Sequence, residues 1–134
     1  MKIKFKDIAQ YYLGTGLEIR HNDGDDLIMN ATGSGSNFIS IDDVEEYGKP
    51  LLRSLDSLTK PITVIGYNEG KEFVPIYHLL QEYCFDTDKM DEDEVFDYSD
   101  SMINVDISFG TVKLLCSWHF NIFNLPETEY IKID

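Results

Sequence analysis

The stretch that decides the fold class is residues 17–31, LEIRHNDGDDLIMNA. Residues 17–20 alternate apolar and charged side chains, which is typical of a strand that buries one face. Asn22-Asp23-Gly24-Asp25 has the composition of the tight turns that close β-hairpins. Residues 27–31 then supply the returning strand, so the stretch predicts an antiparallel hairpin.

Outward from this hairpin, short periodic segments alternate with turns. Residues 5–12 carry apolar side chains at i, i+3, i+4 and i+7, which indicates a helix. Several short strands with hairpin turns and a few short helices favour an α+β fold, a small antiparallel sheet with the helices packed on one face. We predict helices over residues 5–12, 51–58, 75–83 and 110–123, and further strands over residues 38–41, 62–65, 103–107 and 130–133.

The length of 134 residues and the hydrophobic content of 43% suit one domain. A chain of this size buries roughly two-thirds of its unfolded surface. Two separate halves would each be too small for a self-sufficient core. We therefore expect a single domain over residues 1–134, with an acidic loop at about residues 86–100.

The acidic segment, residues 86–100 (DTDKMDEDEVFDYSD), holds half of the net charge of the chain. It contains eight carboxylates and one lysine, a net of −7 out of −14. Nucleic-acid binding needs clustered lysine and arginine that displace counterions, whereas here 25 acidic residues outnumber 11 basic ones. We therefore expect no direct binding to nucleic acid. A basic partner protein is favoured instead.

The chain opens with alternating lysine and apolar residues, and it contains no long apolar run. This pattern indicates neither a signal peptide nor a membrane span, so we expect a cytoplasmic protein without membrane contact. Cys84 and Cys116 both stand among apolar residues, as free core cysteines commonly do.

The patterns for metal binding and catalysis are incomplete. Asp86-Thr87-Asp88 begins like a calcium-binding loop, but Met90 and Asp91 occupy the positions that need a ligand and a glycine. No nucleophile signature or glycine-rich phosphate loop is present. We expect no catalytic, cofactor-binding or metal-binding residues. Zinc sites usually contain two closely spaced pairs of ligands, and His78 and Cys84 are six residues apart. The pattern therefore does not favour zinc binding by the four candidate residues, His78, Cys84, Cys116 and His119.

Four blocks of the chain resemble a group of small phage and prophage proteins whose activity is unknown. They lie at residues 6–17, 49–60 (KPLLRSLDSLTK), 73–76 (FVPI) and 118–123 (WHFNIF). Ser54 stands where that group has proline, and Asn121 and Asn124 stand where it has Asp and Gly. The resemblance implies a bacterial or phage setting and assigns no site residue.

We interpret the acidic segment in two ways. As a solvated loop, it only keeps an exposed connection soluble. As a docking surface, it binds a basic surface of a host protein that handles nucleic acid or serves in defence. The chain would then be a non-enzymatic inhibitor of the phage type. The residues that would bind the partner are Asp91, Glu92, Asp93, Glu94 and Asp97.

The docking hypothesis has a cost if the segment is helical. Asp91 and Glu94 would then be neighbours, and like charges at this spacing repel. The surface would need help from acidic residues at 23–26 and 42–46 on the same face.

Two other functions stay open. A small enzyme or ligand-binding domain would place its pocket between sheet and helices, near Trp118 and His119. A self-assembling module would pair copies through residues 130–133 at a sheet edge. The sequence does not fix the oligomeric state.

Overall fold

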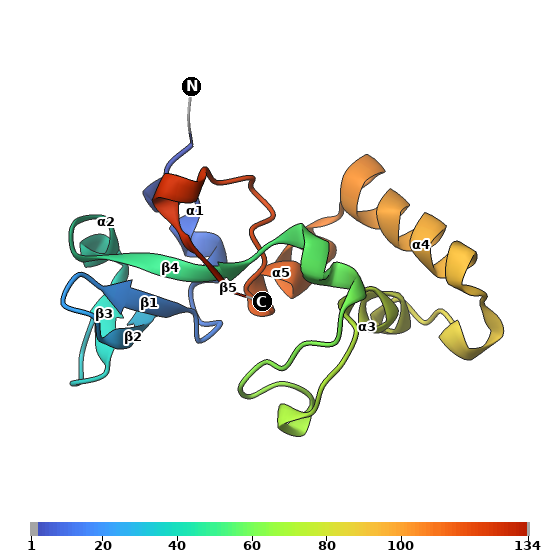
Figure 1. The fold of residues 1–134 in the computed structure, drawn as a ribbon, viewed down its shortest axis with the longest axis horizontal. Coiled ribbons are helices and arrows are strands. Elements are labelled where there is room, and N and C mark those ends of the chain that lie inside the picture. The colour runs from blue at the N-terminus through green and yellow to red at the C-terminus, as the bar shows by residue number, and fades with distance from the viewer. Residues whose placement is uncertain (1–2, 134) are drawn as a thin grey trace. The chain divides into compact units, whose positions relative to one another are not determined.

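The computed structural model describes residues 3–133 of the chain (Figure 1). The chain forms two compact units. The first comprises Met1–Leu55 and Leu115–Asp134, and the second comprises Asp56–Leu114. The second unit is therefore an insertion into the sequence of the first. That the whole chain acts as one domain stays a prediction.

The first unit contains a five-stranded sheet with the strand order β3-β2-β1-β4-β5. The predicted hairpin is confirmed, because β1 (Glu18–His21) and β2 (Asp26–Asn30) pair antiparallel with Ile19 opposite Leu27. In the turn, the Gly24 N–H donates to the His21 carbonyl at 2.9 Å. Gly24 has φ 101°, a conformation that glycine adopts without strain.

The sheet is mixed rather than purely antiparallel. β4 (Gly48–Arg53) pairs antiparallel with β1, whereas β3 (Phe38–Ser40) runs parallel to β2 and β5 (Ile131–Ile133) runs parallel to β4. Each outer strand is parallel to its neighbour, so the connection before it returns the chain to the end of the sheet at which that neighbour began. With its helices, the sheet confirms the α+β class, and β5 is the predicted edge strand.

Short helices accompany this sheet. The predicted helix over residues 5–12 is present as α1 (Phe5–Ile8) followed by a 3₁₀ turn, η1 (Ala9–Tyr12). Residues 41–47 form a 3₁₀ turn, η2 (Ile41–Asp43), and α2 (Val44–Tyr47). The fully buried side chains of this unit include Tyr12, Leu17, Ile19, Met29, Leu52, Leu115, Trp118 and Phe120.

The predicted helix over residues 51–58 is wrong. Residues Gly48–Arg53 form β4, and only Leu55–Thr59 turn, as the 3₁₀ segment η3. The leucines satisfy helical spacing by coincidence, because a short apolar run cannot distinguish a buried strand from a buried helix. The backbone of β4 has partners on both sides, β1 and β5, and these neighbours decide its conformation.

The predicted helix over residues 110–123 is confirmed in its first part only. α5 spans Phe109–Ser117, which crosses the sequence boundary between the units. It ends because His119 adopts the left-handed conformation, with φ 64°. The following residues then leave the helix to bond with β4, so that Asn121 N–H donates to the Arg53 carbonyl at 2.8 Å.

The second unit is built from helices. α3 (Pro75–Glu82) confirms the predicted helix over residues 75–83, with Pro75 in its first turn. The acidic segment is not a loop. It forms a 3₁₀ turn, η5 (Thr87–Lys89), and the helix α4 (Glu92–Asp100), which continues into a π-helical turn, η6 (Ser101–Val105). A further 3₁₀ turn, η4, spans Asn68–Gly70, and η7 (Glu127–Glu129) precedes β5 in the first unit.

Two predicted strands are absent from this unit. Within residues 56–114 no strand forms, and residues 62–65 contribute only an isolated antiparallel bridge between Ile62 and Phe73. The alternation over residues 103–107 is misleading because no neighbouring strand is available to pair with it. Val105 is instead 76% exposed and Ile107 44% exposed.

In the part of the chain that the structure describes, none of the helices combines the length and the apolar character that crossing a membrane requires.

The packing of β4 gives a stability prediction. We expect Leu52→Ala to lower the free energy of unfolding of the first unit by about 2–5 kcal/mol, because a fully buried leucine leaves a cavity. Trp118 is the single tryptophan and is fully buried, so its fluorescence during urea unfolding reports on this unit.

The matched control is Lys49→Ala, at an exposed position of the same strand. It should change the free energy of unfolding by no more than about 0.5 kcal/mol. Equal effects of the two substitutions would contradict the assignment of Leu52 to the core.

Candidate partner-binding surface

The helix α4 begins with a capping box. Asp91 Oδ1 accepts a hydrogen bond from the Glu94 backbone N–H at 2.8 Å, and Glu94 Oε1 accepts one from the Asp91 backbone N–H at 3.3 Å. These bonds satisfy donors that the first turn of a helix otherwise leaves without partners. The two carboxylates expected to repel therefore start the helix together.

The inner face of α4 fixes the rotation of the helix about its axis. Val95 is fully buried and packs with Ile76 and Leu80 of α3. Ser99, four residues on, is 2% exposed and donates its hydroxyl to the Phe96 carbonyl at 3.1 Å. With one face held in this way, the positions on the opposite face must point to solvent.

That opposite face is a row of aspartates, which we call the acidic ridge: Asp93, Asp97 and Asp100. All three are exposed and stand at i, i+4 and i+7. At 1.5 Å of rise per residue, the ridge extends about 10 Å along the helix. Neighbouring like charges at this spacing repel by about 0.2–0.5 kcal/mol per pair. The ridge therefore carries a small electrostatic cost in the free protein.

Nothing basic among residues 3–133 compensates the carboxylates of α4. None of them forms an ion pair with a described residue, and the only hydrogen bond from a side chain to the ridge comes from Asn104 Nδ2, 2.7 Å from Asp100 Oδ1. The second unit holds 13 acidic and 4 basic residues, a net of −9, against 12 and 7, a net of −5, in the first. The negative charge is thus concentrated in the second unit.

The acidic residues at 23–26 and 42–46 belong to the first unit, and Asp26 and Glu45 among them have cationic partners. Asp26 accepts a hydrogen bond from Arg20 Nε at 2.9 Å, and this bond lowers the pKa of the Asp26 carboxyl. Lys6 Nζ lies 3.4 Å from Glu45 Oε1. Residues 23–26 and 42–46 therefore do not extend the ridge within the second unit.

The five predicted partner-binding residues divide by position. Asp91 and Glu94 form the helix cap, Asp93 and Asp97 lie on the ridge, and Glu92 is exposed in the first turn. Their binding to a partner stays a prediction.

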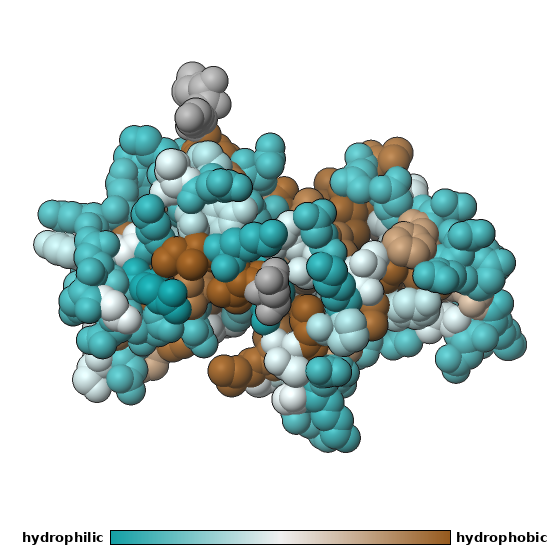
Figure 2. All heavy atoms as spheres, in the orientation of Figure 1, coloured by the Kyte–Doolittle hydropathy of each residue, from teal (hydrophilic) through white to brown (hydrophobic). Residues whose placement is uncertain are grey.

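Asp100 and the aromatic side chains that flank the ridge were not predicted from the sequence. In a helix, the positions four and seven residues after Asp93 lie on the same face. Treating the segment as a helix would therefore have identified Asp100. Phe96 is 42% exposed and Tyr98 is 48% exposed, on the two sides of the ridge. Figure 2 shows hydrophilic side chains covering most of the surface around α4, with hydrophobic patches among them.

A buried cluster in the first unit offers the chemistry most like a catalytic site. The Tyr12 hydroxyl donates to the Phe120 carbonyl, and burial raises the pKa of Tyr12. Burial also raises the pKa of the Cys116 thiol to about 12. His119 Nε2 donates to the Thr15 carbonyl at 2.9 Å, and burial lowers the pKa of its imidazole. Near neutral pH the thiol is protonated and the imidazole uncharged, which suits packing rather than nucleophilic attack.

The two cysteines differ. Cys116 is buried as predicted, but Cys84 is exposed. Cys84 follows the end of α3 in the left-handed conformation, with φ 67°, and the chain turns away from the helix there. Among residues 3–133, no three His, Cys, Asp or Glu side chains are placed to hold a metal ion together.

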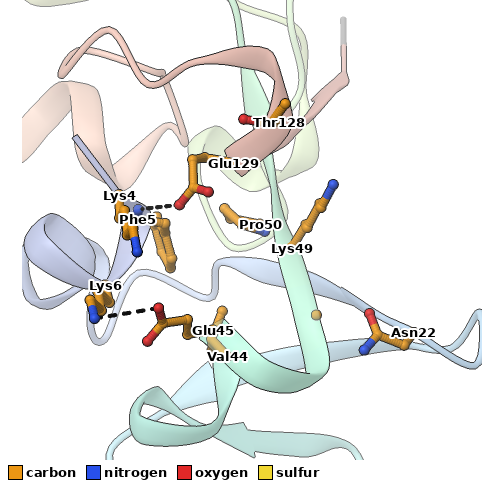
Figure 3. Close-up of a pocket in the computed structure, with 11 residues that line it drawn as sticks. Lys4, Phe5, Lys6, Asn22, Val44, Glu45, Lys49, Pro50, Thr128 and Glu129 are labelled. Atoms are coloured by element: carbon orange, nitrogen blue, oxygen red, sulfur yellow. Dashed lines mark hydrogen bonds and ion pairs between the residues drawn. The ribbon is translucent and has the colours of Figure 1, made fainter. Parts of the chain in front are cut away.

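The first unit also contains a pocket of about 260 Å³ (Figure 3). Its two carboxylates are engaged: Glu45 pairs with Lys6, and Glu129 Oε1 accepts from the Phe5 backbone N–H at 2.9 Å. Lys4 and Lys49 also line it, whereas Trp118 and His119 do not. The pocket is thus not the one expected beside Trp118.

Comparisons of the chain with protein-family models, with curated proteins and with solved structures gave no significant match.

The capping box gives a prediction with a built-in control. Asp91→Ala should cost about 0.5–2 kcal/mol, because it leaves the first turn of α4 without its cap. Asp93→Ala should change the stability of α4 less, because the removal of a like charge beside Asp97 offsets the loss of a favourable carboxylate in the first turn.

Amide hydrogen exchange at Val95, whose N–H donates to the Asp91 carbonyl at 3.1 Å, measures the difference. Exchange should be accelerated more in the Asp91 variant than in the Asp93 variant. Faster exchange in the Asp93 variant alone would show that the ridge, and not the cap, holds the helix.

The two cysteines give a second prediction. At about pH 8 iodoacetamide should modify Cys84 in the native protein and both cysteines in urea, because the Cys116 thiol is buried and its raised pKa leaves almost no thiolate. Mass spectrometry counts the adducts. Because the Cys116 thiol ionises more readily in the unfolded chain, the free energy of unfolding should fall as the pH rises from about 9 to about 12. Native modification of Cys116 at the rate of Cys84 would contradict its burial.

Proposed function

We propose that the chain is a non-enzymatic interaction protein whose acidic helix α4 docks on a basic surface of a partner protein. The observation that carries this proposal is the acidic ridge. Its three aspartates are exposed, stand on one helix face and have no ion pair with any residue from 3 to 133.

The energetics favour a partner over mere solubility. Solubility requires net charge but no particular arrangement of it. The ridge instead keeps like charges at repelling distances on a helix that is held rigidly by Val95. A basic partner surface would convert this repulsion into attraction, which is how charge complementarity steers association.

The charge density indicates the kind of partner. α4 carries five carboxylates over nine residues, or about 13 Å of helix, which is about one per 2.7 Å. A single nucleic-acid strand carries one charge per about 3.4 Å and a duplex one per about 1.7 Å. This similarity supports a partner whose basic surface ordinarily binds nucleic acid. In the phage or prophage setting that the sequence resemblance implies, such a partner would be a host protein in the bacterial cytoplasm, one that handles nucleic acid or serves in defence.

A ligand-binding function in the first unit is the second candidate. It rests on the pocket of about 260 Å³, where the side chains of Lys4 and Lys49 form no ion pair with a described residue and would attract an anion. Because both lysines are solvent-exposed, any ion pair they form is weak, and this candidate ranks below the ridge.

The ridge makes a direct prediction. The variant Asp93→Asn, Asp97→Asn, Asp100→Asn should weaken binding to a partner captured from bacterial lysate by about 0.6–3 kcal/mol, since each exposed ion pair contributes about 0.2–1 kcal/mol. Capture at low salt followed by mass spectrometry identifies the partner. Titration calorimetry then measures the affinity of the partner for the unmodified chain and for the triple variant. Binding of the unmodified chain should weaken as salt rises.

The matched control changes the same amount of charge elsewhere. Asp42→Asn, Asp43→Asn, Glu46→Gln alters three exposed carboxylates of the first unit and should leave affinity nearly unchanged. If both triple variants lose affinity equally, only net charge matters and the ridge is not the docking site. If neither variant loses affinity, the acidic helix takes no part and the ligand-binding candidate takes precedence.

A further inference from the structure

A hollow of about 420 Å³ lies along one side of α4, next to the acidic ridge. Its lining residues, Glu94, Asp97, Tyr98 and Ser101, stand at i, i+3, i+4 and i+7 and therefore share one helix face. The hollow thus combines two carboxylates with an aromatic ring. It is set on a helix whose rotation the Val95 packing fixes.

The ring of Tyr98 is exposed and held in place. It is 48% exposed, and it contacts the ring of Phe85 with centroids 5.3 Å apart and planes at 44°. Phe85 itself is 36% exposed. The open ring beside two carboxylates therefore offers a flat apolar face and negative charge together, a combination that matches a planar cation.

Three kinds of occupant can be compared. A purely apolar group would remove water from Glu94 and Asp97 without replacing its hydrogen bonds, which is costly. A lysine ammonium satisfies a carboxylate as a point charge but is compact and strongly hydrated. An arginine guanidinium is planar, donates paired hydrogen bonds to carboxylates and stacks on aromatic faces at the same time.

We propose that this hollow accepts an arginine side chain from an arginine-rich segment of the partner protein. The inference rests on the proposed function and names its recognition chemistry: Glu94 and Asp97 accept hydrogen bonds from the guanidinium, and Tyr98 stacks against it. The neighbouring ridge supplies the long-range attraction, and the hollow supplies the selection of arginine over lysine.

The experiment uses the full chain and two labelled peptides, one alternating arginine with serine and the other alternating lysine with serine. Fluorescence anisotropy at about 50 mM salt measures both affinities. The unmodified chain should bind the arginine peptide about two- to fivefold more tightly, the size of an exposed cation–π contribution. Tyr98→Leu should abolish this difference and leave the affinity for the lysine peptide unchanged.

Two control variants separate recognition from folding. Tyr98→Phe keeps the ring and should keep the preference for arginine. Tyr47→Leu removes a ring that is 43% exposed in the first unit and should also keep it. Circular dichroism of each variant checks that the helices are intact. Asp97→Asn, which preserves shape, should weaken the arginine peptide more than the lysine peptide.

Amide shifts in NMR spectra locate the peptide. Shifts centred on residues 94–101 support the inference, whereas shifts centred on residues 42–46 overturn it. Equal affinity for the two peptides, or no binding of either, also overturns it. The proposed function is tested separately, by the effect of the triple ridge variant on binding of the captured partner. If the partner requires the ridge but the chain shows no preference for the arginine peptide, the inference is wrong and the proposed function still stands.

Discussion

The hydrogen bonds around Arg53 close the first unit across the insertion. The Arg53 N–H donates to the His119 carbonyl at 2.8 Å, its carbonyl accepts from Asn121, and its Nη1 donates to the Trp118 carbonyl at 2.7 Å. Arg53 is 8% exposed, and burial lowers the pKa of its guanidinium, which nonetheless stays charged at neutral pH. These bonds join the chain just before it leaves the first unit and just after it returns. The entropic cost of closing such a loop grows only slowly with its length, so a long insertion between the two segments is tolerated.

Within the inserted unit, the acidic helix forms because its favourable terms exceed its repulsion. The capping bonds of Asp91 and Glu94 are worth about 0.5–2 kcal/mol. Burial of Val95 adds about 1.5–3 kcal/mol. The repulsion among Asp93, Asp97 and Asp100 costs only about 0.2–0.5 kcal/mol per neighbouring pair. A segment that looks too charged to be ordered is therefore a helix, and it presents its charges in a fixed array.

The sequence predicted those parts of the fold that local chemistry decides. The hairpin of residues 17–31 follows from alternation and an Asn-Asp-Gly turn, and α3 from Pro75 and its apolar face. β4 was mistaken for a helix because its conformation depends on β1 and β5, which are distant in sequence. For the candidate site, composition located the acidic segment but not its geometry. The number of charges does not reveal that Val95 and Ser99 point inward. It therefore does not reveal that Asp100 lies on the exposed face of the helix.

The difference between paired and unpaired carboxylates explains why the ridge is a better candidate than the total charge. In the first unit Asp26 and Glu45 have cations within 4 Å, so their charges act locally. The ridge has no such partner among the described residues, and its field therefore extends to the screening length of about 8 Å at physiological ionic strength. A fixed row of unpaired charges extends its attraction into the solvent, whereas scattered and paired carboxylates of the same number would not.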